Sequence, residues 1–217
     1  MSSRAETVAA LEACGVVAVI RLKEAGTLRA VVDALAAGGV LALEVTMTVP
    51  RALELIAEIA PSLPPEIVLG AGTVLDAATA RAAIEAGARY VVSPVFREEV
   101  LRVCHRAGVA AMPGCFTPTE ILAASEAGAD VVKVFPATAL GPGYFRDLRG
   151  PFPDLRLMPT GGVSLANAGD WIRAGAVAIG VGTALVDAGT VAARRFDEIT
   201  ERARQFVAAV AAARSER

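Results

Sequence analysis

The segment EAGADVVKVFP at residues 126–136 holds the pattern that decides the fold: the end of an Ala-rich helix, an Ala-Gly pair and a short apolar strand. The same unit returns as EAGARYVVSP at 85–94, RAGVAAMPG at 106–114 and RAGAVAIGVG at 173–182. The glycine of each copy stands just after the helix, where a left-handed residue commonly ends it. Each copy therefore predicts a helix, a tight turn and a buried strand of a parallel sheet.

Looser copies of the unit extend the series to eight strands. They read VVAVIR at 16–21, AAGGVLALEVT at 36–46, EIVLGAGT at 66–73 and RLMPTGG at 156–162. The predicted strands end roughly 20–28 residues apart, and no low-complexity segment interrupts them. We therefore predict an α/β protein, a (β/α)8 TIM barrel that forms a single domain over residues 1–217 with an N-terminal helix. A doubly wound open sheet is the alternative.

The composition limits the function. Hydrophobic residues make up 54% of the 217 residues and aromatic residues only 5%, which is typical of an aliphatic α/β interior. The net charge of −2 includes no basic block, so we expect no nucleic-acid partner. No apolar run reaches the roughly 18 residues of a membrane span, and the N-terminus does not resemble a signal peptide. Three cysteines without CxxC spacing, Cys14, Cys104 and Cys115, predict free thiols in a cytoplasmic protein.

Local signals mark one helix start and one weak region. Thr117-Pro118-Thr119-Glu120 combines an N-cap residue, a proline at the first helical position and a glutamate two residues later. A helix should begin there, so the residues before it should form a loop after a strand. Residues 137–153 are rich in Gly and Pro and leave room only for a short helix.

The carboxyl ends of barrel strands carry the active site, so unusual residues matter most there. Five occur at such ends: Arg21, Glu44, Thr73, Lys133 and Thr160. Lys133 interrupts the apolar run VVKVF, and it is one of only two lysines beside nineteen arginines. A lysine among apolar neighbours releases its proton more readily and can act as an amine nucleophile, which an arginine cannot. A packed ion pair with a carboxylate is the alternative.

Glu44 lies within the apolar strand LALEVT and should reach the same end as Lys133. There it can transfer protons, or it can serve only as the counter-ion of Lys133 or Arg21. His105, the only histidine, lies on the helical stretch EEVLRVCHRAG, where we expect a structural role. No group of residues has metal-ligand spacing, so we predict chemistry without a metal or an organic cofactor.

Two glycine-rich turns follow the last two predicted strands: PTGGVS at 159–164 and GVGTA at 180–184. Backbone N–H groups in such turns bind anions, and this position is the usual phosphate site of the fold. The candidate phosphate-binding residues are Gly161, Gly162, Gly182 and Thr183. Tight turns without a ligand are the alternative.

These motifs together resemble the class I 2-keto-3-deoxy-6-phosphogluconate (KDPG) aldolases, a family that also includes 4-hydroxy-2-oxoglutarate (KHG) aldolase activity. The resemblance covers nearly the whole chain and rests on GGVLALEVT, GAGTVL, EAGARYVVSP, MPGCFTPTE, KVFPA, GPFPDLRLMPTGGVS and AIGVGTALV in this order. It implies a homotrimer that cleaves the phosphorylated keto acid to pyruvate and glyceraldehyde 3-phosphate. The rival functions are a 2-keto-3-deoxy-6-phosphogalactonate aldolase, a non-aldolase phosphosugar enzyme such as an epimerase or a thiamine-phosphate synthase, and a non-catalytic phosphosugar-binding protein.

The resemblance also implies a role for each matching residue. Lys133 forms the Schiff base and Glu44 is the acid and base. The pocket residues are Thr73, Pro94 and Phe135, and the phosphate ligands are Gly161, Gly162 and Thr183.

Two positions depart from related sequences. Some members read LEVTLRT, with an arginine for the substrate carboxylate, where this chain reads LEVTMTV with Thr48. We expect Arg21, which those members lack, to bind the carboxylate, with Thr48 as a neutral hydrogen-bond donor. Thr160 stands where the galactonate-specific aldolases resemble VGG, and its hydroxyl favours the gluconate-derived substrate.

Overall fold

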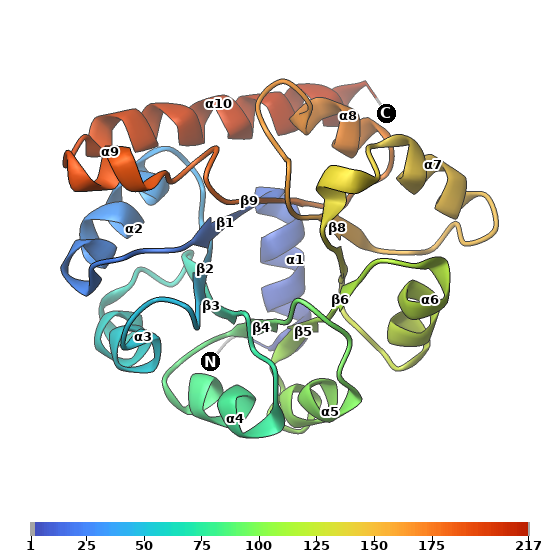
Figure 1. The fold of residues 1–217 in the computed structure, drawn as a ribbon, viewed down its shortest axis with the longest axis horizontal. Coiled ribbons are helices and arrows are strands. Elements are labelled where there is room, and N and C mark those ends of the chain that lie inside the picture. The colour runs from blue at the N-terminus through green and yellow to red at the C-terminus, as the bar shows by residue number, and fades with distance from the viewer. Residues whose placement is uncertain (1–2, 217) are drawn as a thin grey trace.

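Helices and strands alternate along the chain, and the helices surround the strands (Figure 1). The computed structural model describes residues 3–216, so residues 1–2 and 217 of the predicted domain lie outside it. The helices are α1 (Arg4–Cys14), α2 (Leu28–Ala37), α3 (Ala52–Ile59), α4 (Ala77–Glu85), α5 (Glu98–Arg106), α6 (Pro118–Glu126), α7 (Gly143–Arg149), α8 (Ala168–Arg173), α9 (Ala188–Ala192) and α10 (Phe196–Ser215). The strands are β1 (Val16–Ile20), β2 (Ala42–Thr46), β3 (Val68–Gly72), β4 (Tyr90–Val92), β5 (Ala110–Met112), β6 (Gly114–Cys115), β7 (Val132–Val134), β8 (Leu157–Pro159) and β9 (Ile179–Val181). Short 3-10 turns span Ala25–Thr27, Ala60–Ser62 and Ala137–Ala139.

Each of the eight predicted segments contains a strand. The segment 106–114 contains β5 and the first residue of β6. Pro113 divides the predicted fifth strand into β5 and β6, because proline has no N–H for a ladder hydrogen bond. All paired strands are parallel. One sheet has the order β5-β4-β3-β2-β1-β9 and the other the order β6-β7-β8. A bridge between Thr160 and Gly180 connects the end of β8 with β9. The order lacks the reversal of a doubly wound sheet, so that alternative is wrong.

The local signals in the sequence act as predicted. The Thr117 N–H donates to Glu120 Oε2 (2.8 Å), and the Glu120 N–H donates to Thr117 Oγ1 (3.3 Å). This pair and Pro118 begin α6. The region 137–153 contains a 3-10 turn and the short helix α7, as predicted. The glycines after four helices have positive φ angles; they are Gly87, Gly108, Gly128 and Gly175.

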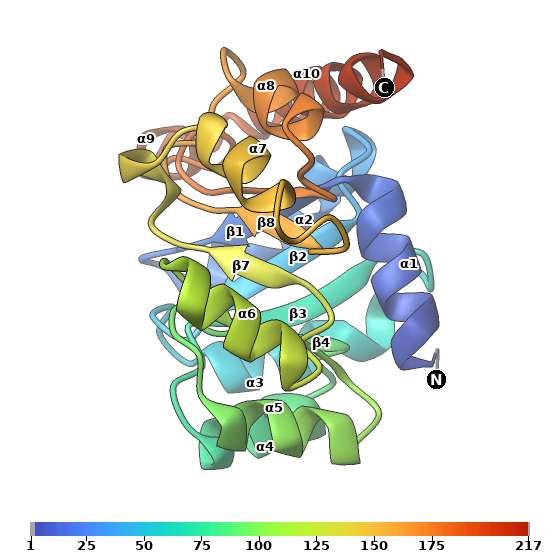
Figure 2. The same cartoon turned by 90° about the vertical axis from the view of Figure 1, so that its right-hand side faces the viewer.

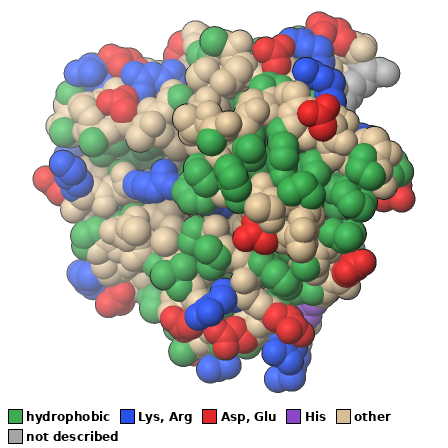
Figure 3. Space-filling model, turned by 45° about the vertical axis from the view of Figure 1, so that its right-hand side comes forward, with side chains coloured by type: hydrophobic (Ala, Val, Ile, Leu, Met, Phe, Trp, Pro, Cys, Tyr) green, Lys and Arg blue, Asp and Glu red, His purple; other side chains and the backbone are tan. Residues whose placement is uncertain are grey.

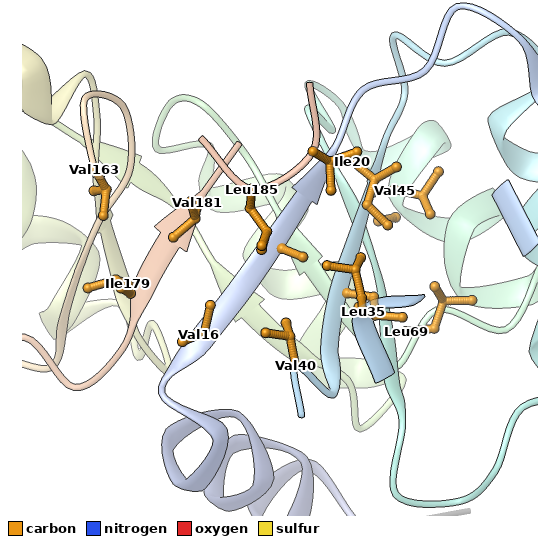
Figure 4. Close-up of a cluster of buried hydrophobic side chains, with 14 of the residues drawn as sticks. Val16, Ile20, Leu35, Val40, Val45, Leu69, Val163, Ile179, Val181 and Leu185 are labelled. Atoms are coloured by element: carbon orange, nitrogen blue, oxygen red, sulfur yellow. The ribbon is translucent and has the colours of Figure 1, made fainter. Parts of the chain in front are cut away.

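The main hydrophobic core lies between the strands and the surrounding helices. Val16 and Ile20 of β1 point toward it with Leu35 of α2 and Val181 of β9 (Figure 4). Successive side chains of a strand point to opposite faces, so Val17 belongs instead to a second, inner cluster. Burial of each such side chain stabilises the fold by about 1.5–3 kcal/mol.

Helix α1 covers the amino ends of the strands (Figure 2). Its Val8 and Leu11 pack on strand residues of the inner cluster, such as Val17, Val68 and Met112. The predicted N-terminal helix is therefore present and closes one end of the strand assembly. In the part of the chain that the structure describes, no helix is both long and apolar enough to cross a lipid bilayer.

Candidate functional site

Lys133 and Glu44 meet at the interior of the strand assembly. Lys133 lies in β7 and Glu44 in β2, and Lys133 Nζ is 4.0 Å from Glu44 Oε1. Their side chains are only 3% and 0% exposed. Lys133 Nζ is also 5.2 Å from the centre of the Phe135 ring. The two charged residues that interrupt apolar strands in the sequence therefore form one buried pair.

The surroundings of Glu44 leave its carboxyl group without hydrogen bonds. The carboxyl lies over Gly72 of β3, where any side chain would overlap it. Among residues 3–216, neither carboxylate oxygen has a hydrogen-bond partner. A buried carboxylate in this state is costly, and such exceptions concentrate at catalytic sites. The Glu44 carboxyl therefore has unused hydrogen-bond capacity beside the Lys133 amine.

A pocket of about 400 Å³ contains both glycine-rich turns. Gly161 and Gly162 have φ angles of 94° and 71°, which a glycine adopts readily. Within the described chain, the N–H groups of Gly162 and Thr183 donate no hydrogen bond. The residues that line the pocket are Arg21, Phe135, Thr160, Gly161, Gly162, Val163, Ser164, Gly180, Gly182, Thr183 and Ala184. Free backbone donors around a cavity form a candidate anion site.

The first glycine turn is held by side chains that the sequence reasoning missed. Asn167 Nδ2 donates to the Gly162 carbonyl (2.9 Å), and the Ser164 N–H donates to Asn167 Oδ1 (2.9 Å). A Cβ atom at Gly162 would lie 3.0 Å from Thr138 Oγ1. Ser164 belonged to the motif but not to the predicted set. Asn167 resembled an ordinary residue at a helix start, which was its only signal.

Arg21 lies at the mouth of this pocket. Its side chain is exposed after β1, and its Nη1 atom would lie 3.0 Å from a Cβ atom at Gly182. The pocket also contains Phe135, which is next to Lys133. The guanidinium therefore lines the same pocket as the two glycine turns.

Thr48 forms a hydrogen bond with a neighbouring threonine. Its hydroxyl is 2.7 Å from Thr46 Oγ1, and Thr46 Oγ1 donates to the Ile20 carbonyl (3.2 Å). Because Thr46 gives its proton to Ile20, Thr48 must be the donor to Thr46. Thr48 thus connects the ends of β2 and β1 and is not one of the residues that line the pocket.

The family model described as KDPG and KHG aldolase matches residues 8–202. The chain belongs to the KDPG and KHG aldolase family. It is 43% identical over 141 residues, 64% of each protein, to a 2-dehydro-3-deoxy-phosphogluconate aldolase of Pseudomonas aeruginosa. It is 37% identical to a probable 2-dehydro-3-deoxy-6-phosphogalactonate aldolase of Rhizobium meliloti, over 80% of this chain and 82% of that protein.

One similar solved structure shows a family member in covalent contact with a keto acid. It is the KDPG aldolase of Legionella pneumophila with pyruvate captured as a covalent carbinolamine intermediate. The two structures agree with a TM-score of 0.85 at 28% identity, over 91% of this chain and 96% of the other.

Three other residues that the sequence of this protein singles out lie at the carboxyl ends of strands. Thr73 directly follows β3 and has a φ of 61°, a left-handed conformation that costs a non-glycine residue about 1–3 kcal/mol. Pro94 follows β4, and its backbone packs against Gly114. Thr160 follows β8; it is buried over Gly180, and no residue of the described chain bonds its hydroxyl.

His105 lies away from these residues, in α5. Its Nε2 atom is 3.7 Å from Asp130 Oδ2, and burial, followed by the charge of Arg4, lowers the pKa of the imidazole. This position fits the structural role that the sequence predicted. The described residues contain no cluster of three or more His, Cys, Asp or Glu side chains that could hold a metal ion.

Proposed function

We propose that this protein is a class I aldolase that cleaves KDPG to pyruvate and glyceraldehyde 3-phosphate through a Schiff base on Lys133. The observation that carries the proposal is the buried Lys133 amine, 4.0 Å from the Glu44 carboxyl and next to a pocket with free backbone N–H groups. Membership of the KDPG and KHG aldolase family supports it. The covalent carbinolamine of the Legionella pneumophila enzyme supports the same chemistry.

The reaction begins when the neutral Lys133 amine attacks the C2 ketone. An Nζ–C2 bond forms, the ketone oxygen takes up a proton, and loss of water from this carbinolamine gives an iminium ion. Glu44 transfers the protons, directly or through water. Glu44 then accepts the C4 hydroxyl proton while the C3–C4 electron pair moves into the iminium, which releases glyceraldehyde 3-phosphate. Protonation of the enamine at C3 and hydrolysis release pyruvate and restore the amine.

The two charged ends of the substrate require separate binding groups. We assign the phosphate to the N–H groups at Gly161, Gly162, Gly182 and Thr183. We assign the carboxylate to Arg21, whose guanidinium is the cation that lines the pocket. The side chains of Thr73, Pro94, Phe135 and Thr160 complete the wall around the keto acid, with Thr48 as support at the edge.

We further propose that the strands close into one (β/α)8 barrel that forms a single domain. The bridge between Thr160 and Gly180 supports closure on one side, and the continuity of β5 and β6 across Pro113 supports it on the other. When β5 and β6 are counted as one interrupted strand, the strands number eight.

We also propose a homotrimer that works in the cytoplasm. Hydrophobic side chains gather on the face that carries α6, α7 and α8 (Figure 3). Phe116 and Leu165 are among the exposed large apolar residues. Apolar surface of this kind commonly contacts another subunit, which sedimentation equilibrium would measure. The free thiols of Cys14, Cys104 and Cys115 support a reducing compartment.

Borohydride reduction in the presence of pyruvate tests the mechanism. The sequence has only two lysines, so mass spectrometry can assign the adduct without ambiguity. We expect a pyruvyl adduct on Lys133 in the wild type and in Lys23→Ala, and none in Lys133→Ala. An unmodified Lys133 would favour a phosphosugar-binding or epimerase-like protein instead.

A galactonate-derived substrate is the second candidate, because the relative from Rhizobium meliloti is named for it. Thr160 supports a preference for the gluconate-derived substrate. A single hydrogen bond supplies about 10-fold discrimination. Cleavage rates for both epimers and for 4-hydroxy-2-oxoglutarate, measured on the wild type and on Thr160→Val, decide between them. A preference that does not change in Thr160→Val would exclude Thr160 as its source.

A further inference from the structure

Tyr90 of β4 is a fully buried phenol without a hydrogen bond. Its ring is 0% exposed, and no residue of the described chain bonds its hydroxyl oxygen. A buried tyrosine hydroxyl normally has a partner, because an unpaired one loses its bonds to water without replacement. The reaction proposed above assigns no role to the Tyr90 hydroxyl.

The strand register puts Tyr90 beside Glu44. Both residues pair with Gly70 of β3, Glu44 from β2 and Tyr90 from β4. The Tyr90 ring fills the side-chain space over Gly70, and the Glu44 carboxyl fills the space over Gly72. Residues two apart in a strand lie on the same face. The Tyr90 ring and the Glu44 carboxyl therefore lie over neighbouring positions of the inward face of β3.

The electrostatics make Tyr90 a donor. Burial raises the pKa of Tyr90 well above its usual value, followed by the charge of Glu44 and then that of Cys14. The phenol therefore keeps its proton, and a neutral phenol can donate a hydrogen bond to a carboxylate. The other ionisable groups around the pair are Lys133 of β7, 4.0 Å from Glu44, and Cys14 at the end of α1.

We infer that Tyr90 is a positioning residue for Glu44, and that its O–H donates through one buried water to the Glu44 carboxylate. The water gives partners to buried polar atoms that otherwise have none, which is the common role of internal water. The contact fixes the carboxyl beside Lys133, where it can accept the C4 hydroxyl proton. This inference rests on the proposed function for its catalytic meaning, but not for its geometry.

The kinetic test compares Tyr90→Phe with Tyr144→Phe. The chain has only these two tyrosines. Tyr144 lies on α7, where its hydroxyl donates to the Phe116 carbonyl (2.8 Å) and not to a group near Glu44. Loss of the phenol donor removes the group that fixes the position of the Glu44 carboxyl. In Tyr90→Phe we expect a roughly 10-fold fall in kcat with little change in KM. Pyruvate trapping on Lys133 should persist, and Tyr144→Phe should match the wild type. A Tyr90→Phe enzyme with the wild-type kcat overturns the inference.

A spectroscopic test does not depend on turnover. With 13C at the ring carbon that bears the hydroxyl, the protein should give two tyrosine resonances, which the two Phe variants assign. At neutral pH, Glu44→Gln should move the Tyr90 resonance and leave that of Tyr144 in place, because only Tyr90 is linked to the carboxylate. An unchanged Tyr90 resonance overturns the inference even in an active aldolase. A protein without aldolase activity in which the resonance moves refutes the proposed function and keeps the Tyr90–Glu44 contact.

Discussion

The two ends of the strand assembly treat their charged groups in opposite ways. At the amino end, Asp130 accepts hydrogen bonds from Arg4 Nε (2.7 Å) and from the Ala111 N–H (2.8 Å). At the carboxyl end, Glu44 is fully buried, and within the described chain its only charged neighbour is Lys133, at 4.0 Å without a hydrogen bond. The chain itself supplies hydrogen bonds to the Asp130 carboxylate and none to that of Glu44. This difference agrees with the proposed function, in which the amino end stabilises the fold and the carboxyl end carries the chemistry.

Of the changes at the carboxyl end, removal of Lys133 should lower the rate of cleavage most. Without the amine no Schiff base forms, so Lys133→Ala should lose cleavage by a factor on the order of 10⁴ or more. Lys23→Ala, which removes the other lysine from an exposed loop, should keep wild-type turnover. Steady-state assays, with circular dichroism to verify folding, provide the measurement. Cleavage by Lys133→Ala above one hundredth of the wild-type rate would contradict the mechanism.

Substitution of Glu44 should have the next largest effect. Glu44→Gln keeps the shape but cannot accept a proton, so kcat should fall by about 10²–10⁴-fold while KM changes little. Pyruvate should still be trapped on Lys133 by borohydride, only more slowly, because the amine remains. If kcat stayed within about 10-fold of the wild type, Glu44 would be a counter-ion and not the proton carrier.

Arg21 tests which end of the substrate the exposed guanidinium holds. Loss of hydrogen bonds to a charged group predicts that Arg21→Ala raises KM by roughly 10–100-fold. If Arg21 binds the carboxylate, the pyruvate concentration needed for trapping should rise by the same factor, while inhibition by inorganic phosphate should not change. The matched control is Arg194→Ala, another exposed arginine nearby but outside the pocket with the glycine turns. Weaker phosphate inhibition with unchanged pyruvate trapping would instead assign Arg21 to the phosphate.

The sequence predicted those features whose cause is local. The apolar runs and the glycine after each helix located the strands, and Thr117 and Glu120 located the start of α6. A charged residue within an apolar strand is also a local signal, which is why Lys133 and Glu44 could be found.

Features that depend on neighbouring strands could not be predicted in this way. The sequence offered Tyr90 only as one more apolar strand residue. Its relation to Glu44 requires both side chains to lie on the two glycines of β3, which only the register reveals. The hydrogen bond between Thr48 and Thr46 likewise depends on a turn whose geometry the sequence does not specify. The division of the predicted fifth strand into β5 and β6 at Pro113 was not predicted either.

Asp130 should have the smallest effect on catalysis, and it tests the stabilising end directly. Asp130→Ala removes the partner of Arg4 and of the Ala111 N–H, and the carboxylate is only 9% exposed. We expect the free energy of unfolding to fall by about 1–3 kcal/mol in urea denaturation, with kcat/KM equal to that of the wild type. Asp33→Ala is the matched control, because its pair with Arg29 is exposed and should contribute less than about 0.5 kcal/mol. A large fall in kcat/KM for Asp130→Ala would mean that the two ends are coupled, because distant, independent sites should not influence each other in this way.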